Sequence, residues 1–175
     1  MKIGLSIAAI AVISTTAVAG AQGKKPMMGG HGMTRAQWQA MYDQADKAFD
    51  KMDSKSIFMY MAPDFTLTMM GKTQGKDEAE AGLKKWFGMM KSLHCTMTIT
   101  KVSGDMNHAV VVDHFNNWGM TKPDPKTHKS GKYVDRGTET ATWEKMNGKW
   151  MMKSLVSKDE KMTMNGKPFN PNMGG

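Results

Sequence analysis

The residues of this sequence best placed to do acid–base chemistry are His114 and Glu139. Each lies in a run, 108–118 and 133–145, where apolar and polar residues alternate, which predicts two β-strands. If these strands pair across the intervening loop as a symmetric hairpin, His114 lies close to Gly137 and diagonal to Glu139. A histidine beside a carboxylate can transfer or orient a proton near neutral pH. The pair is our catalytic candidate, and the alternative is that both are solvated or dimer-facing polar residues.

The same register places Asp113 and Arg136 together on the opposite face, where they can form an ion pair. A shift of one residue moves every side chain of a strand to the other face. The assignment of all four polar residues therefore depends on how the loop between the strands closes.

The methionines are the second group of residues that could take part in chemistry. They account for 21 of 175 residues. Met27, Met28, His31 and Met33 lie in the glycine-rich segment 22–33, which has no period and predicts a flexible linker. Thioethers and an imidazole are soft ligands suited to Cu(I) or Ag(I). The alternative is that methionine replaces leucine throughout the chain or scavenges oxidants.

Other chemistry is poorly represented. The single cysteine, Cys95, cannot form an intramolecular disulfide and is expected to be a small buried hydrophobe on a strand. Paired-cysteine zinc spacings, a phosphate-binding loop, a Gly-x-Ser-x-Gly elbow and a His-Glu-x-x-His helix are absent from the sequence. No cofactor is predicted.

The N-terminus has the pattern of an export signal. Lys2 precedes an apolar run, 3–13, and small residues surround Ala19 and Ala21. We expect residues 1–21 to be a cleaved signal peptide, so that the mature protein is secreted or periplasmic without stable membrane insertion. An uncleaved membrane anchor is the alternative.

The net charge of +8 comes from lysines scattered along the chain. No basic stripe with interleaved aromatic residues is present, so a nucleic-acid partner is not expected.

The elements expected to position these residues begin with helices. Apolar residues spaced three and four apart predict a helix over 34–51, capped by Thr34. A second, short helix starts at Asp53 or Ser54 and stops before Pro63.

Strands follow. Alternation predicts a strand over 64–70, and after a further helix that opens at Gly75 the period changes to two. The later strands are expected at 94–102, 108–118, 133–145 and 149–157. Residues 34–160 thus form one domain, and 161–175 are expected to be a flexible tail.

Asn147-Gly148 predicts a two-residue hairpin turn, because both residues tolerate positive φ. A hairpin centred there places Trp143 opposite Met152 and Trp150 opposite Lys145. Both indole rings are expected to pack in the core.

In the order and spacing of its segments, the chain resembles the nuclear-transport-factor-2-like superfamily, specifically its SnoaL-like and ketosteroid-isomerase-like secreted branch. The matching features are a helix ending at Asp53, YMAPDF at 60–65, Gly75 before the next helix, VSGDMNHAVV at 102–111 and TATWEKMNGKW at 140–150. The resemblance implies an α+β fold, in which a cone-shaped, curved antiparallel sheet wraps around a long N-terminal helix, with two further helices. It also implies a pocket inside the cone and a homodimer formed through the outer face of the sheet.

The resemblance also allows isomerase chemistry to be checked by position. The carboxylate base of such isomerases falls near Met69, and their hydroxyl donor falls near Ala45, one turn from Tyr42. Their oxyanion-binding acid falls near Gly137, two residues before Glu139. Methionine cannot abstract a proton, so a ketosteroid-type isomerase is not expected.

We therefore expect an exported domain that binds a small, largely apolar molecule in its cone. Three alternatives remain: a polyketide-cyclase or dehydratase-type enzyme using the His/Glu pair or Tyr60, a soft-metal binder acting through the linker, and a dimeric interaction module without a ligand. The side chains expected around a bound molecule are Tyr42, Tyr60, Met69, Trp86 and Trp143.

Overall fold

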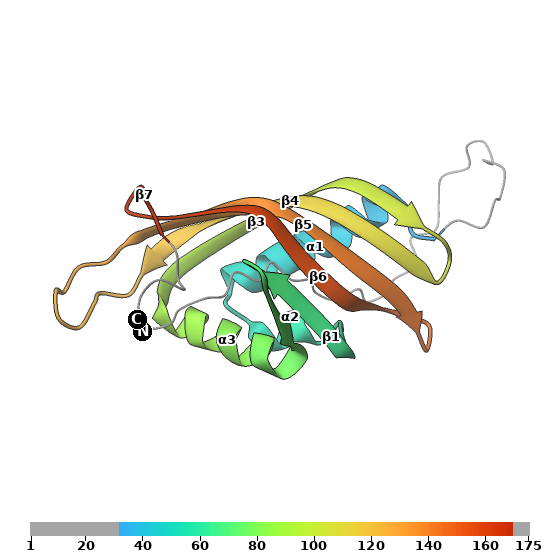
Figure 1. Cartoon of the computed structure of the whole chain (residues 1–175), viewed down its shortest axis with the longest axis horizontal. Helices are drawn as coiled ribbons and strands as arrows, with labels where there is room; N and C mark the ends of the chain where they lie inside the picture. The colour runs from blue at the N-terminus through green and yellow to red at the C-terminus, as the bar shows by residue number, and fades with distance from the viewer. Residues whose placement is uncertain (1–31, 170–175) are drawn as a thin grey trace.

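The computed structural model describes residues 32–169, which form three helices on the concave side of one curved sheet (Figure 1). The helices are α1 (Arg35–Asp50), α2 (Ser54–Phe58) and α3 (Lys76–Met89). The strands are β1 (Met61–Met69), β2 (Lys72–Gly75), β3 (Met90–Gly104), β4 (His108–Thr121), β5 (Lys132–Met146), β6 (Lys149–Met164) and β7 (Lys167–Pro168).

The sheet runs in the order β2-β1-β6-β5-β4-β3, and β7 pairs with β6. All neighbours are antiparallel except β1 and β6, which are parallel. In Figure 1 the long strands β3 to β6 arch over α1, while α3 lies below them beside β1. The predicted α+β fold, a curved sheet around a long N-terminal helix with two further helices, is confirmed. No helix in the described part of the chain is long and apolar enough to cross a membrane.

The long helix α1 forms where the apolar spacing predicts it. Thr34 accepts from the Gln37 backbone N–H, and the Gln37 side chain accepts from the Thr34 N–H, which completes a capping box. The buried stripe of α1 consists of Trp38, Met41, Tyr42, Ala45, Ala48 and Phe49. This stripe packs under the sheet and forms one wall of the core.

The hairpin between β5 and β6 has the predicted register. Asn147 and Gly148 adopt φ of 51° and 79°, as a two-residue turn requires. Trp143 pairs with Met152, and Lys145 pairs with Trp150.

The predicted flexible tail is wrong for residues 161–168. β6 continues to Met164, turns through Asn165 and Gly166 with φ of 55° and 75°, and pairs with β7. The alternation of apolar and polar residues persists beyond Ser157, and a second Asn-Gly pair supplies the turn. This second Asn-Gly pair carries the same turn signal as Asn147-Gly148.

The first strand differs from its expected bounds. It begins at Met61, before Pro63, and a short partner, β2, follows a turn at Met70 and Gly71, whose φ values are 49° and 76°. β2 consists of four largely polar residues, so no alternation of apolar and polar residues predicts this strand.

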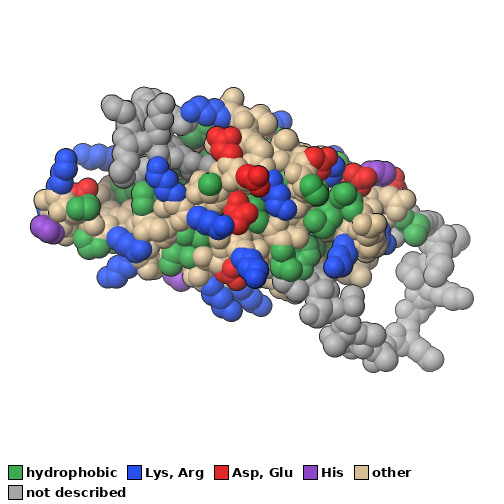
Figure 2. Space-filling view, turned by 90° about the horizontal axis from the view of Figure 1, so that it is seen from below, with side chains coloured by type: hydrophobic (Ala, Val, Ile, Leu, Met, Phe, Trp, Pro, Cys, Tyr) green, Lys and Arg blue, Asp and Glu red, His purple; other side chains and the backbone are tan. Residues whose placement is uncertain are grey.

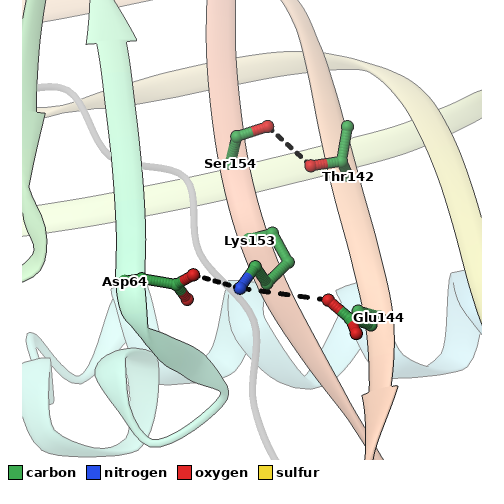
Figure 3. Close-up of polar contacts among 5 residues, drawn as sticks. All are labelled: Asp64, Thr142, Glu144, Lys153 and Ser154. Carbon is green, nitrogen blue, oxygen red and sulfur yellow. Dashed lines mark hydrogen bonds and ion pairs between the residues drawn. The ribbon is translucent and has the colours of Figure 1, made fainter.

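A lysine ties three strands together where the β5–β6 register shifts (Figure 3). Lys153 on β6 donates to Asp64 on β1 and lies 3.9 Å from Glu144 on β5. Beside it, the hydroxyls of Thr142 and Ser154 are 2.6 Å apart. The pKa of Asp64 lies below its ordinary value because Lys153 donates to the carboxylate.

The free edge of the sheet, β3, is covered by polar side chains of α1. The Gln39 amide donates to the Met97 carbonyl at 2.8 Å and accepts from the Ile99 N–H at 2.9 Å, and Arg35 donates to the Ile99 carbonyl. These bonds satisfy backbone groups that an edge strand otherwise leaves open.

Two carboxylates continue this row further along α1. Asp46 accepts from the Met97 N–H at 3.3 Å, and Asp50 accepts from the Cys95 N–H at 3.1 Å. The polar side of α1 therefore acts as a substitute strand for β3.

Candidate functional site

Four polar residues lie fully buried on the concave side of the neighbouring strands β4 and β5. Asp113 and Asn117 belong to β4, Asp135 and Glu139 belong to β5, and none is more than 1% exposed. The register places Asp113 opposite Glu139 and Asn117 opposite Asp135. Residues on one strand that are two or four apart share a face, so both cross-strand pairs point toward the helices, about 13 Å apart along the strands.

The first pair lies beneath α1 and forms what we call the acid cluster: Asp113, Glu139 and Asp46. Neither carboxyl oxygen of Asp113 has a hydrogen-bond partner among residues 32–169. The charges of Asp113 and Glu139 both act on the buried Tyr42 hydroxyl, and the charge of Asp46 acts on Asp113. One helix and two strands thus bring three carboxyl groups together.

Burial changes the protonation of this cluster. It raises the pKa of Asp113 to about 8, and the neighbouring charge of Asp46 contributes to the rise. Burial also raises the pKa of Asp46 to about 7, although the Met97 N–H partly offsets it. At neutral pH Asp113 is therefore mainly a neutral carboxylic acid, which can donate as well as accept.

Aromatic side chains line one side of the acid cluster. The rings of Tyr42 and Trp143 are 6.5 Å apart, and Trp38 lies 5.2 Å from Trp143 and 5.3 Å from Trp150. Burial, followed by the charge of Asp113, raises the pKa of Tyr42 well above 10, while Trp143 lowers it. The Trp143 indole N–H lies toward the Tyr42 hydroxyl, but neither group makes a hydrogen bond of standard geometry within the described chain. Two further buried polar groups thus accompany the carboxyls.

The second pair forms a separate group. The Tyr133 hydroxyl donates to Asp135 at 3.2 Å, and Glu160 of β6 reaches the same carboxyl group. Burial raises the pKa of Glu160 to about 8, and the charge of Asp135 adds to the rise. The strand bulges at Asp159, whose φ is 52°, next to a register shift between β5 and β6. A bulge of this kind redirects the following side chain, here Glu160.

Phe115 separates the two pairs. It lies opposite Gly137, and a Cβ added to Gly137 would lie 2.9 Å from the Phe115 ring. Glycine is needed at this position so that the ring can cover the strand. The acid cluster and the second pair are therefore two distinct polar sites.

The predicted pairing of His114 with Glu139 is wrong. His114 pairs with Thr138, is exposed, and its Nδ1 lies 3.0 Å from the Thr138 hydroxyl on the outer face. Glu139 points inward. The hairpin closes one residue away from the symmetric register, and the bond from the Thr121 N–H to the Gly131 carbonyl at 2.9 Å continues the observed register beyond the strands.

The same register overturns the predicted ion pair of Asp113 and Arg136. Asp113 is buried, whereas Arg136 is exposed and pairs with Asn116 on the outer face. The register therefore exchanges the partners and places two acids, rather than an acid and a base, opposite each other.

The predicted ligand-lining residues are divided between the two ends of the core. Tyr42 and Trp143 lie at the acid cluster, whereas the Trp86 ring lies 5.4 Å from Tyr133, beside the second pair. Met69 is buried on β1. The fifth, Tyr60, is partly buried against the core.

Of the predicted soft-metal ligands, Met27, Met28 and His31 lie outside the described residues. Met33 lies within them and packs, partly buried, against the core. The part of the chain that the structure describes contains no group of three or more His, Cys, Asp or Glu side chains arranged to hold a metal ion. Cys95 is buried, as expected, and burial raises the pKa of its thiol, which disfavours the nucleophilic thiolate.

Sequence reasoning missed Asp113, Asn117, Asp135 and Glu160 as site residues. For the β4 residues the signal was present. Val111 and Phe115 alternate with Asp113 and Asn117 on one face, so two polar residues occupy positions where the pattern demands apolar ones. For Glu160 no local signal exists, because a bulge determines its direction.

Taken together, these features define a cone-shaped α+β domain with polar groups buried beneath its long helix. No protein-family model matches the sequence, and a comparison with curated protein sequences finds no match either. Solved structures do match, and the similarity covers most of the described domain.

Three examples illustrate the similarity. The nuclear transport factor 2 (NTF2-like) superfamily protein from Salmonella enterica is 13% identical, with a TM-score of 0.57 over 80% of this chain and 94% of that one. A conserved protein from Planctomyces limnophilus is 13% identical, with a TM-score of 0.58 over 74% and 97%. The hexachlorocyclohexane dehydrochlorinase LinA type 2 is 17% identical, with a TM-score of 0.56 over 78% and 88%.

This protein has the fold of the nuclear-transport-factor-2-like superfamily. The resemblance predicted from the sequence is thus confirmed at the level of the fold. Proteins that share a fold at such low identity can differ in activity, so function must be argued from the site.

Proposed function

We propose that this domain binds a small, largely apolar molecule on the concave side of its sheet, with the acid cluster as the polar anchor. One observation carries the proposal: Asp113 and Glu139 lie opposite each other, fully buried, beneath the Tyr42 hydroxyl. The surrounding core is apolar and aromatic, which is the usual setting for a few convergent polar groups in a ligand site.

The energetic argument concerns Asp113, whose carboxyl oxygens have no hydrogen-bond partner in the described chain. Burying such a carboxyl group is costly for folding, and an apolar residue of similar volume is often at least as stable. Acidic side chains whose pKa is strongly shifted by burial are concentrated at functional sites. The position of Asp113 under α1 is therefore better explained by recognition of a ligand than by stability.

Titration of the protein with Nile red, an uncharged apolar dye, tests ligand binding. We expect a saturable rise in fluorescence with one site per chain. The double variant Asp113→Asn/Glu139→Gln is expected to change the affinity, whereas Asp43→Asn, an exposed acid on α1, leaves it unchanged. Absence of saturable binding to the wild-type protein would contradict the proposal.

A second candidate function is proton transfer on the bound molecule, and the raised pKa of Asp113 favours it. An acid that keeps its proton at neutral pH, opposite a second carboxyl, is the arrangement that separates general-acid and general-base roles. The ionised partner would take a proton from carbon, while the Asp113 hydroxyl would donate to the substrate oxygen. This pair replaces His114 and Glu139 in the cyclase or dehydratase hypothesis, and the structural similarity to an enzyme named as a dehydrochlorinase supports it.

Hydrogen–deuterium exchange tests this second candidate. The probe is 4-phenyl-2-butanone in D2O, whose exchange at the carbon beside the carbonyl is followed by NMR. We expect faster exchange with the wild-type protein and Asp43→Asn than with Asp113→Asn. Equal rates with all three proteins would reject catalysis by the acid cluster.

We also propose that the protein is exported, supported by Lys2, the apolar run 3–13 and the small residues at Ala19 and Ala21. N-terminal sequencing of protein produced by cells should find a chain starting after Ala19 or Ala21. A chain starting at Met1 in the same material would contradict export by cleavage.

Homodimerisation through the outer face of the sheet remains a proposal. Part of this face consists of exposed, uncharged side chains. These are Thr96, Thr98 and Thr100 on β3 and Val110 on β4. Sedimentation equilibrium should report twice the mass of one chain. The Val110→Lys variant should have the mass of a single chain.

A further inference from the structure

The basic side chains of this protein are unevenly distributed over its surface. One end of the sheet carries exposed lysines on the β4–β5 loop and on the strand ends beside it, which we call the basic tip: Lys91, Lys122, Lys126, Lys129, Lys132 and Lys167. Asp124 is the one acidic residue of the loop, 121–132. Over the remaining described residues, basic and acidic side chains are equal in number, fifteen of each. The excess of positive charge in the described domain is therefore concentrated at the basic tip.

The fold brings together lysines that are far apart in the sequence. Lys91, near the start of β3, lies beside Thr121, where the loop begins. Lys167 of β7 pairs with Met164, next to the end of the loop. In Figure 1 the loop projects beyond the rest of the sheet, at the end where β7 lies. Figure 2 shows basic side chains, a histidine and little acidic surface at this narrow end, whereas acidic side chains are more frequent toward the middle.

The charges of the basic tip are not neutralised by neighbouring acids. Within residues 32–169, none of its lysines forms an ion pair with an acidic side chain, and the ion pairs of lysine lie at Lys84 and Lys153. The Asp124 carboxylate is turned to the loop backbone, where it accepts from the Lys126 N–H at 2.9 Å and the Thr127 N–H at 2.8 Å. These two bonds, more than the charge of Lys126, lower the pKa of Asp124. The lysine charges therefore remain available to a partner.

The loop holds its lysines in a defined arrangement. At its base, the Lys122 amine donates to the Gly88 carbonyl at 2.7 Å, and the Lys122 N–H donates to the Met89 carbonyl at 2.7 Å. At its turn, the His128 N–H donates to the Asp124 carbonyl at 2.8 Å. A surface that is ordered before binding loses less conformational entropy when a partner arrives.

We propose that the basic tip is a docking surface for an anionic phospholipid bilayer. The negative charge of such a surface complements the lysines, and each lysine held close to it adds a favourable contribution that salt weakens. Because the loop projects from the sheet, a flat surface can reach several of its lysines at once (Figure 1). The contact is electrostatic and peripheral, and it is independent of the ligand proposed for the concave side.

The composition of the tip favours a lipid surface over a nucleic acid. Proteins that bind single strands combine basic side chains with aromatic rings on which the bases stack. The loop contains no phenylalanine, tyrosine or tryptophan. The aromatic residues that flank it in the chain, Trp118 and Tyr133, are half-buried and buried. The tip thus offers charge to a phosphate but no stacking surface to a base.

Co-sedimentation of the purified protein with lipid vesicles tests the proposal. The probes are vesicles of phosphatidylcholine alone and vesicles of phosphatidylcholine mixed with phosphatidylglycerol in a 2:1 ratio. We expect binding to the anionic vesicles only. Raising sodium chloride from about 0.05 M to about 0.5 M should release the protein, because the Debye length shortens.

A triple variant locates the effect at the tip. Lys126→Gln/Lys129→Gln/Lys132→Gln should reduce the partition coefficient about fivefold for each lysine removed, and thus by roughly a hundredfold in total. Circular dichroism confirms that the variant is folded. The Nile red titration should be unchanged in this variant, so failure of the docking proposal leaves ligand binding standing.

A second triple variant is the matched control. Lys101→Gln/Lys145→Gln/Lys149→Gln removes the same charge from exposed lysines at the opposite end of the sheet. We expect its partition coefficient to stay within about twofold of the wild type.

Three outcomes would overturn the proposal. Equal losses in both triple variants would show that net charge, and not the basic tip, determines binding. Binding to pure phosphatidylcholine as strong as to the anionic vesicles would exclude recognition of the lipid charge, as would absence of binding to either. Tighter binding to duplex DNA than to anionic vesicles at equal phosphate concentration, lost in the tip variant, would identify a nucleic acid as the partner instead.

Discussion

Two sets of buried or half-buried carboxyl groups lie on the concave side of this protein, and they differ in what they contact. Asp46 and Asp50 on α1 each accept a backbone N–H from the free edge of β3. The second set is the acid cluster, in which Asp113 on β4 has both oxygens without a partner in the described chain. The bonds of the first set complete the fold, whereas Asp113 has no such bond to explain its burial.

The difference shows how to recognise a site residue by its contacts. An acid that caps an edge strand replaces a missing neighbour strand, so its role ends with stability. An acid held inside a sheet without such a role costs stability and points to recognition or proton transfer. Asp46 belongs to both sets, because one oxygen caps β3 and its charge acts on Asp113.

The largest expected effect is the pH dependence of stability. Asp113 and Asp46 have folded-state pKa values of about 8 and about 7, above their ordinary value of 3.8, so the native state binds more protons than the unfolded state. The stabilising contribution of these two protonated acids is therefore fully present below about pH 4 and is lost as the pH rises to about 8. Urea denaturation should show a decrease on the order of 3 kcal/mol between pH 5 and pH 8.

Asp113→Asn provides the control for this prediction, because it removes one of the titrating groups. The slope of stability against pH should become shallower in the variant. An unchanged slope would mean that Asp113 does not hold its proton in the native protein.

The next effect tests the row of edge-capping side chains. Gln39→Ala leaves the Met97 carbonyl and the Ile99 N–H without their side-chain partner, so we expect a loss of about 2 kcal/mol in the free energy of unfolding. Lys47→Ala, on the exposed side of α1, should change it by less than about 0.5 kcal/mol. Similar losses in both variants would show that the contacts to β3 do not matter.

A smaller effect of opposite sign is expected at the acid cluster. Asp113→Asn should stabilise the protein at pH 8 by about 1 kcal/mol, because the buried side chain at position 113 no longer has to be ionised, and should be nearly neutral at pH 5. Thermal unfolding at both pH values measures the difference. A loss of stability at pH 8 comparable to that of Gln39→Ala would place Asp113 among the structural acids.

The smallest effect is expected at the end of α1. The Asp50 side chain is 44% exposed, and its carboxylate lies 3.6 Å from His94 while accepting the Cys95 N–H. Asp50→Asn keeps an oxygen that can accept this bond, so the free energy of unfolding should change by less than about 0.5 kcal/mol. A larger loss in the free energy of unfolding, measured by urea denaturation, would show that the exposed contact between Asp50 and His94 stabilises the protein.

Much of the fold could be predicted locally. The helix capped by Thr34 and the hairpin at Asn147-Gly148 follow from capping and turn chemistry, and both were predicted with the correct position. The pair Asn165-Gly166 carries the same turn signal, yet its hairpin was missed because the segment lies at the end of the chain. Polar β2 carries no such signal.

The residues of the acid cluster and its surroundings were predicted only in part. Tyr42, Trp143 and Glu139 were among the candidate residues, because each belongs to a recognisable stripe or to a position implied by resemblance. Asp113 was assigned to the wrong face and His114 to the site, since their faces depend on one residue of register in a long loop.

The sequence by itself determined the helices, the long strands and the hairpin at Asn147-Gly148, because spacing, capping and positive-φ residues act within a few positions along the chain. Only the tertiary structure decided which polar side chains meet inside the sheet. Side chains alternate with a period of two, so the closure of the β4–β5 loop selects the face, and a bulge redirects Glu160. Burial then sets the protonation of these acids, and burial is a property of the packed molecule.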